Sequence, residues 1–175
     1  MLQTEKTMLR LPTDGDLPRL TDWRNDIALQ VSLMAVPRPN SPERVRAWLA
    51  RRLEDEHGVF FIVADRQTNL AVGFVQALNL DFVHGRGELG ICLCPQAQGK
   101  GFAAEALWLL ERYLVDRFRL RKLTLSVLAN NERARRFYLR EQFTESGLLH
   151  KHFYAEGAYH DVVVMEKFLP HSEAA

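Results

Sequence analysis

The sequence lacks the features that mark membrane-spanning, secreted or metal-dependent proteins. It contains no run of about 18 apolar residues that would span a bilayer, and its first residues lack the apolar core of a signal peptide. Its six histidines are scattered without the spacing of metal ligands. We therefore expect no membrane contact, no bound metal and a cytoplasmic location.

Cysteine is scarce, and an excess of either charge is absent. The two cysteines, Cys92 and Cys94, alternate along one predicted strand, where residues two apart share a face and are poorly placed to pair. We expect free, buried thiols in a reducing compartment. The formal net charge is +1, so no overall field favours nucleic acid as a partner.

What remains is an ordinary globular composition, with 47% hydrophobic and 26% charged residues. A chain of 175 residues is long enough for one domain with its own core. We expect a single domain over residues 1–175, with its core over about 8–168.

Hydrophobic periodicity and turn residues predict alternating strands and helices. Strands are expected at 7–12, 59–64, 70–80, 88–93 and 122–128, followed by a hairpin at 144–168. Helices are expected at 17–25, from 42 to a stop at Gly58, at 103–116 and at 131–141, with Asp16 and Ser41 as N-caps of the first two. Short loops predict an antiparallel meander over 59–93, and the helical crossover that follows predicts a parallel pair of strands. The result is a mixed α/β sheet.

The most informative segment is Gln96-Ala97-Gln98-Gly99-Lys100-Gly101-Phe102-Ala103, the glycine loop, which joins a predicted strand to a predicted helix. The first turn of a helix carries unpaired N–H groups and the positive end of the helix dipole, and glycines let that backbone approach an anion. The loop therefore predicts a phosphorylated ligand. No Ser or Thr follows its Gly-Lys pattern, which excludes the loop of nucleotide triphosphatases, and the dinucleotide fingerprint is not matched either.

Two motifs together resemble one protein family. The spacing Gln-x-x-Gly-x-Gly at a strand-to-helix junction resembles the acetyl-CoA pyrophosphate loop of the GNAT N-acetyltransferases. A second strand-then-helix segment, with Asn131, Ala134 and Tyr138 and then Phe143, resembles another part of that family, although Gln142 stands where glycine is usual. The resemblance implies the GNAT fold, a mixed central β-sheet flanked by helices, with strands splayed at the acetyl-CoA site.

The resemblance also implies which residues hold acetyl-CoA. Backbone N–H groups of the glycine loop would bind the pyrophosphate, and the strand backbone at 91–93 would pair with the pantetheine amides and stabilise the oxyanion. Asn131 would bond the pantetheine arm, cap its helix, or do both. The expected cofactor-binding residues are Ile91, Cys92, Leu93, Gln96, Gln98, Gly99, Lys100, Gly101, Phe102, Ala103 and Asn131. Arg133, Arg135 and Arg136 form a solvated helix face, or one of them lies near the adenosine 3′-phosphate.

Two residues are candidates for catalysis. Tyr138 is the candidate general acid for the leaving thiolate, and its alternative role is packing of the helix onto the sheet. Glu88 is the candidate base, because we expect it among small and apolar residues, a setting that favours a protonated carboxyl. Its alternative roles are to orient the substrate or to end a strand.

The acceptor is less defined by the sequence than the donor. Segments around Glu88 and Tyr159 look like the subgroup of ribosomal-protein N-terminal, spermidine and UDP-4-amino-sugar acetyltransferases. We favour a small amine, first an amino sugar nucleotide and next a polyamine, because the basic residues Arg24, Arg38, His84 and Arg86 lie in candidate cleft loops. The alternatives are a protein N-terminal acetyltransferase and a non-catalytic acyl-CoA sensor. The family resemblance also makes a homodimer an expectation.

Overall fold

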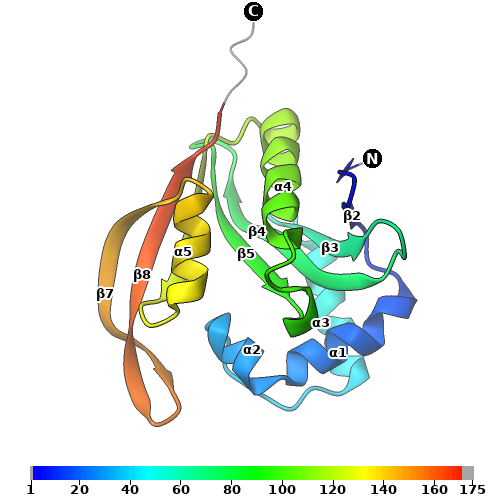
Figure 1. The fold of residues 1–175 in the computed structure, drawn as a ribbon, viewed down its shortest axis with the longest axis horizontal. Helices are drawn as coiled ribbons and strands as arrows, with labels where there is room; N and C mark the ends of the chain where they lie inside the picture. The colour runs from blue at the N-terminus through cyan, green and yellow to red at the C-terminus, as the bar shows by residue number, and fades with distance from the viewer. Residues whose placement is uncertain (1, 171–175) are drawn as a thin grey trace, which may run out of the picture.

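The computed structural model describes residues 2–170, so residue 1 and residues 171–175 of the expected domain lie outside the described residues. The strands are β1 (Leu2–Gln3), β2 (Thr7–Arg10), β3 (Val59–Asp65), β4 (Ala71–Asp81), β5 (Arg86–Leu93), β6 (Lys122–Leu128), β7 (Thr144–Ala155) and β8 (Ala158–Phe168). The helices are α1 (Leu17–Asn25), α2 (Ile27–Ser32), α3 (Pro42–Glu54), α4 (Phe102–Phe118) and α5 (Glu132–Arg140), with 3₁₀ turns η1 (Asp14–Asp16) and η2 (Pro95–Ala97). The eight strands form one sheet in the order β1-β2-β3-β4-β5-β6-β8-β7 (Figure 1).

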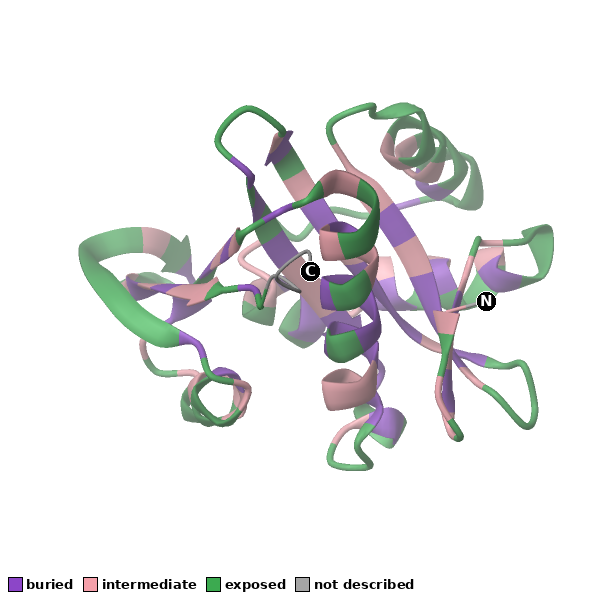
Figure 2. Ribbon diagram, turned by 90° about the horizontal axis from the view of Figure 1, so that it is seen from above, coloured by how far each residue is buried: buried purple, intermediate pink, exposed green. Residues whose placement is uncertain are grey.

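Helices pack on both faces of this sheet, because side chains alternate along each strand. On β3, Phe61 meets Tyr113 of α4 with ring centroids 5.2 Å apart, while its neighbour Phe60 meets Trp48 of α3 at 5.6 Å on the opposite face. Figure 2 shows the buried residues gathered along the central strands. This arrangement confirms the predicted α/β class.

The pairing of the central strands agrees with the sequence prediction, but the contact between β5 and β6 is short. β3, β4 and β5 form the expected antiparallel meander, and β5 pairs with β6 in parallel. The parallel pairing is confined to Arg86–Lys122, Gly87–Leu123 and Glu88–Thr124, whereas β4 pairs with β5 as far as Leu93. The strands β5 and β6 therefore diverge after Glu88, and in Figure 1 the β7–β8 side and the β4–β5 side separate toward the bottom of the view.

Several element boundaries differ from those expected. Helix α3 begins at the predicted Ser41 cap but ends at Glu54, before Gly58. Helix α2 was not predicted, and Asp26 caps it by accepting a hydrogen bond from the Leu29 N–H at 2.9 Å. Asp16 precedes α1 but makes no capping bond to it, because its carboxylate is engaged elsewhere.

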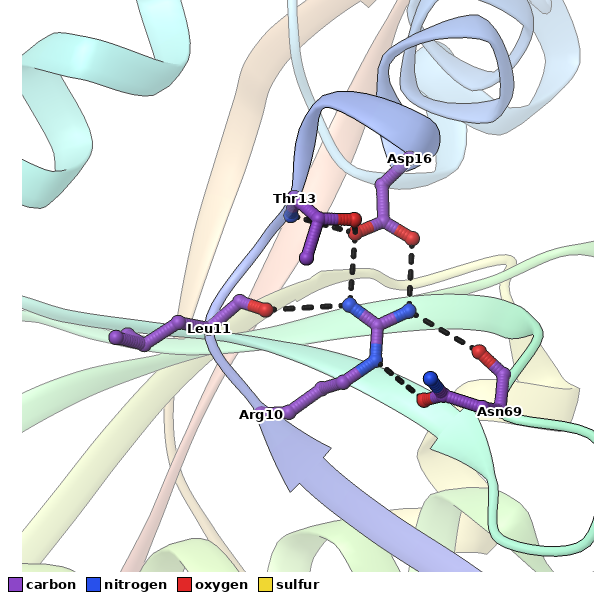
Figure 3. A network of polar contacts seen from close by, with 5 residues as sticks. All are labelled: Arg10, Leu11, Thr13, Asp16 and Asn69. Carbon is purple, nitrogen blue, oxygen red and sulfur yellow. Dashed lines mark hydrogen bonds and ion pairs between the residues drawn. The ribbon is translucent and has the colours of Figure 1, made fainter.

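The carboxylate of Asp16 joins three segments near the N-terminal end of the sheet. Its two oxygens accept hydrogen bonds from Arg10 at 2.7 and 2.8 Å, and the Thr13 N–H donates to it at 2.7 Å. The Arg10 Nε also donates to Asn69 at 2.8 Å, in the β3–β4 turn (Figure 3). Burial by itself raises the pKa of Asp16, but the bonds from Arg10 and Thr13 outweigh it and lower the pKa.

Replacing Asp16 by Asn tests this network. Asp16→Asn leaves a largely buried guanidinium without its countercharge, so we expect the free energy of unfolding at pH 7 to fall by about 3 kcal/mol in urea titrations. Because the folded pKa of Asp16 is lowered, the stabilisation is present above the unfolded value of about 3.9 and is lost as the pH falls through the folded pKa. The difference in the free energy of unfolding between Asp16→Asn and the wild type should therefore become smaller below about pH 4. Asp14→Asn, at an 88% exposed carboxylate, is the control, and an equal effect at both positions would contradict the role of the network.

The end of α5 contains a strained residue. Gln142 has a φ of +68°, the left-handed conformation that glycine adopts without cost, and its position allows the Phe143 N–H to bond the Tyr138 carbonyl at 2.9 Å. Gln142 thus adopts the conformation typical of the glycine that the family resemblance leads us to expect at this position.

Gln142→Gly should consequently stabilise the protein. Relief of the left-handed strain exceeds the entropy that glycine adds to the unfolded chain, so we expect a gain of about 0.5–1 kcal/mol in chemical denaturation. Glu141→Gly, at φ −81°, removes no such strain and should destabilise. A loss of stability in Gln142→Gly would show that the backbone of Gln142 is not strained.

Candidate acetyl-transfer site

A cleft of about 930 Å³ opens where β5 and β6 diverge. Strands β4, β5 and β6 line it together with α1–α2, α3, α5 and the glycine loop. The cleft thus brings together the two sequence motifs, which are separated by about thirty residues in the chain.

The glycine loop presents the start of α4 to this cleft. Gly99 and Gly101 have φ values of +76° and +87°, and Gly101 occupies the N-cap position of α4. Because glycine has no side chain, no side-chain hydrogen bond caps this helix. Its first N–H groups are therefore positioned as an anion-binding site at the positive end of the helix dipole.

Cationic side chains hold the glycine loop from two sides. Gln98 donates to the Leu93 carbonyl at 3.0 Å and accepts a hydrogen bond from Arg133 at 2.7 Å. Lys6 donates to the Lys100 carbonyl and its Nζ lies 4.7 Å from the centroid of the Phe102 ring. The loop therefore lies in a locally positive environment.

The structure distinguishes among the three arginines of α5. Arg133 lines the cleft beside the glycine loop. Arg135 forms an ion pair with Glu145 at 2.6 Å, and Arg136 forms one with Glu132 at 3.5 Å. Only Arg133 of these three faces the loop.

Most of the expected cofactor-binding residues line the cleft. They are Ile91, Cys92, Leu93, Gln98, Gly99, Gly101, Ala103 and Asn131. Gln96 and Lys100 have exposed side chains outside the lining, and Phe102 is 4% exposed in the core, so any contact of theirs with a ligand would involve the backbone. Asn131 caps α5 by accepting from the Ala134 N–H at 3.1 Å, and it lines the cleft as well.

Tyr138 lies on the α5 wall of the cleft and is 9% exposed. Its ring packs edge-on against Phe143, with centroids 5.6 Å apart, so the packing role and a cleft-facing role coexist. Burial raises the pKa of the Tyr138 phenol, which therefore keeps its proton throughout the neutral range.

Cross-strand pairs between β4 and β5 form the cleft floor. The pairs are Phe74–Cys92, Gln76–Gly90 and Leu78–Glu88. These six residues lie on one face of the sheet, because residues two apart along a strand share a face. Glu88 lies between the small and apolar residues Gly87 and Leu89, but these two take the buried positions and Glu88 itself is exposed. Glu88 accepts a hydrogen bond from the Asn79 amide at 3.0 Å.

Gln76 is a residue that the sequence reasoning missed. Its Oε1 is buried and has no hydrogen-bond partner within residues 2–170. Gly90 makes room for it, because a Cβ at Gly90 would lie 2.9 Å from the Gln76 Nε2. The only signal in the sequence is an amide placed between the apolar residues Val75 and Ala77.

Of the four basic residues considered for the acceptor, one lines the cleft. Arg24, at the end of α1, lies with its guanidinium carbon 4.6 Å from the centroid of the Trp48 ring. Arg38, His84 and Arg86 are not in the lining, so their expected placement there is wrong.

Two further findings bear on cofactors and membranes. Across residues 2–170, no group of three or more His, Cys, Asp or Glu side chains is arranged to hold a metal ion. None of the described helices is both long and apolar enough to cross a bilayer.

Burial raises the pKa of Cys92 to about 12, so this residue of the cleft floor is a neutral thiol rather than a nucleophile.

Comparison with known proteins agrees with this geometry. A family model for the acetyltransferase (GNAT) domain matches residues 6–144. The spermidine N(1)-acetyltransferase of Vibrio cholerae is 33% identical over 117 residues, which are 65% of this chain and 67% of that protein.

Solved structures extend the similarity over the whole described fold. The crystal structure of the Vibrio cholerae spermidine N-acetyltransferase in complex with CoA and spermine has a TM-score of 0.87 at 26% identity, and the match covers 95% of this chain and 97% of that one. A dodecameric structure of the same bacterium's enzyme has a TM-score of 0.80 at 26% identity, with 95% of each chain covered. With the family model spanning most of its length and the fold shared with a spermidine N-acetyltransferase, this chain belongs to the GNAT family and is an acetyl-CoA-dependent N-acetyltransferase.

Proposed function

We propose that this chain acetylates the primary amine of a small acceptor by direct attack of the amine on the thioester of acetyl-CoA. The observation that carries this proposal is a single cleft with an uncapped helix N-terminus at the glycine loop and a polar floor at Gln76 and Glu88. Tyr138 lies on the wall of the same cleft. An anion site, an amine site and a proton donor are the parts that this transfer needs.

The donor would lie along the free edge of β5. Beyond Glu88 this edge has no β6 partner within the described chain, so backbone groups at Ile91–Leu93 are available to pair with the pantetheine amides. The pyrophosphate would bind the N–H groups of the glycine loop, with Arg133 beside it. The Asn131 amide nitrogen remains for the pantetheine arm.

The amine would approach over the cleft floor. The buried Oε1 of Gln76 would accept one N–H bond from it, which satisfies an otherwise unpaired acceptor. Glu88, exposed and oriented by Asn79, would take the proton of the ammonium directly or through water and pass it to solvent.

Tyr138 would complete the exchange. As the amine nitrogen bonds to the carbonyl carbon and the carbon–sulfur bond breaks, the phenol gives its proton to the thiolate, the nitrogen releases its remaining excess proton to solvent, and a solvent proton restores the phenol. A phenol whose pKa is raised by burial is a weak acid, so the transfer requires that the same burial also raise the pKa of the CoA thiol that receives the proton.

The identity of the acceptor separates the competing proposals. Similarity to spermidine N-acetyltransferases supports spermidine, whereas the basic residues of the cleft support an amino sugar nucleotide. Acetylation of a peptide N-terminus would support a protein N-terminal acetyltransferase, and the absence of turnover with any amine would support an acyl-CoA sensor. A thiol-release assay with acetyl-CoA against polyamines, amino sugars, aminoglycosides and short peptides distinguishes all four.

Self-association is likewise proposed rather than established. The expected homodimer draws support from the dodecameric structure of the Vibrio cholerae enzyme. The mass of the protein in solution, measured by light scattering, would decide between a monomer, a dimer and a larger assembly.

Tyr138→Phe tests the proton donor. Loss of the hydroxyl should lower kcat by about 100-fold and leave the dissociation constant of acetyl-CoA unchanged, as measured by thiol release and calorimetry. Tyr113→Phe removes a hydroxyl from α4 outside the cleft and should have no effect on kcat. Unchanged turnover in Tyr138→Phe would remove this residue as the acid.

Arg133→Ala tests the donor site. Loss of its charge beside the glycine loop should weaken CoA binding by about tenfold in calorimetry, which corresponds to roughly 1.4 kcal/mol. Arg136→Ala, in the next turn of the same helix and exposed, is the matched control and should bind CoA as the wild type does. Equal weakening by both would indicate only a general loss of positive charge.

A further inference from the structure

We infer that the acceptor carries an anionic group, a carboxylate or a phosphate, besides its amine, and that Arg24 binds this group in the cleft. The inference rests on the proposed acetyl transfer and names the substrate class for it. Nothing in the family assignment requires such a group.

Arg24 lines the cleft and has a buried hydrogen-bond donor that no described residue pairs with. Its guanidinium stacks on Trp48 at 4.6 Å, and its buried Nε has no hydrogen-bond partner anywhere in residues 2–170. Within that range no carboxylate lies within ion-pair distance of it. A partly buried cation with a buried, unpaired N–H costs free energy in the folded protein, unless a ligand supplies the missing acceptor.

The surroundings of Arg24 add positive charge. Burial lowers the pKa of Arg24, and the nearby cations Arg52 and Arg44 lower it further. Arg52 is half-buried and lines the same cleft, and no ion pair neutralises it in the described part of the chain. The cleft therefore has an electropositive end formed by α1 and α3.

Three acids line the cleft, of which Glu141 lies at the end of α5 and the other two are engaged in hydrogen bonds. Asp26 caps α2 through the Leu29 N–H, and Glu88 accepts from Asn79. Cys92, a residue of the cleft floor that is close enough to Arg24 for an electrostatic interaction, is a neutral thiol. None of these groups supplies the countercharge that Arg24 lacks.

The cleft floor thus has ends of opposite sign. Glu88 marks the acidic end, and Cys92, four residues further along β5, marks the end near Arg24, a span of about 13 Å at roughly 3.3 Å per residue. An acceptor whose amine lies over Gln76 and Glu88 would place a second group near Arg24. A polyamine would bring a second cation there, where like charges repel in a poorly solvated site, whereas an anionic group would be attracted.

Matched pairs of amines test this. We would measure kcat/KM by thiol release for glucosamine 6-phosphate against glucosamine, for leucine against leucinamide, and for spermidine. We expect the anionic member of at least one pair to be preferred by about tenfold or more, and Arg24→Met to abolish that preference without changing the KM for acetyl-CoA. Spermidine exceeding every anionic amine, a preference that survives in Arg24→Met, or a raised KM for acetyl-CoA would each overturn the inference.

A binding experiment keeps the test independent of turnover. Inorganic pyrophosphate titrated into the CoA-saturated protein should bind in calorimetry, and Arg24→Met should abolish this binding while Arg51→Met, an exposed change on α3, should not. No binding to the wild type would refute the anion site, whereas acetylation of no amine at all would refute the proposed function instead.

The melting temperature of Arg24→Met is a third readout. Methionine keeps the packing on Trp48 and removes the unpaired buried charge, so the free variant should melt no lower than the wild type. A clearly lower melting temperature would show that Arg24 is structural and would contradict the inference.

Discussion

The site depends on where the hydrogen bonds between β5 and β6 stop. Three residue pairs join these strands, and beyond Glu88 each strand is held only by its other neighbour, β4 on one side and β8 on the other. Unpaired backbone groups inside a sheet are costly, so a gap of this kind persists only when the two halves of the sheet are each well anchored. We propose that the gap receives the pantetheine arm, which can itself pair as a strand does, and the uncapped start of α4 lies at the open end of the gap.

Unsatisfied polar atoms and the cleft coincide in a way that packing alone does not explain. Of three buried side-chain atoms without partners in the described chain, two belong to Gln76 and Arg24, which both line the cleft. An unsatisfied buried group costs about 1–3 kcal/mol, and folded proteins rarely retain one without a use for it. The acceptor side of the cleft is therefore organised for hydrogen bonds that the protein does not make with itself.

The structure brings most of the residues expected on the donor side into the cleft, but only one of the four basic residues expected on the acceptor side, and the difference has a physical reason. Gly99, Gly101 and Asn131 act through backbone conformation and helix capping, which depend on local residue type and spacing. Arg24 and Gln76 matter because of burial and missing partners, which only the packing of α1 and α3 on the sheet determines. The exposure of Glu88 has the same origin, because the pairing of β5 with β4 sets the phase of alternation along β5. Helix α2 has only six residues, too few for a periodic pattern to identify it.

The two cysteines have a practical consequence for anyone following this reaction. Cys92 and Cys94 are 2% and 7% exposed and form no disulfide, and the raised pKa of Cys92 leaves almost none of it as thiolate at neutral pH. Chromogenic disulfide reagents react with exposed thiolates, so the native protein should contribute little background colour while free coenzyme contributes all of it. A slow rise in protein-derived colour would instead report opening of the sheet at β5, which makes the same reagent a probe of unfolding.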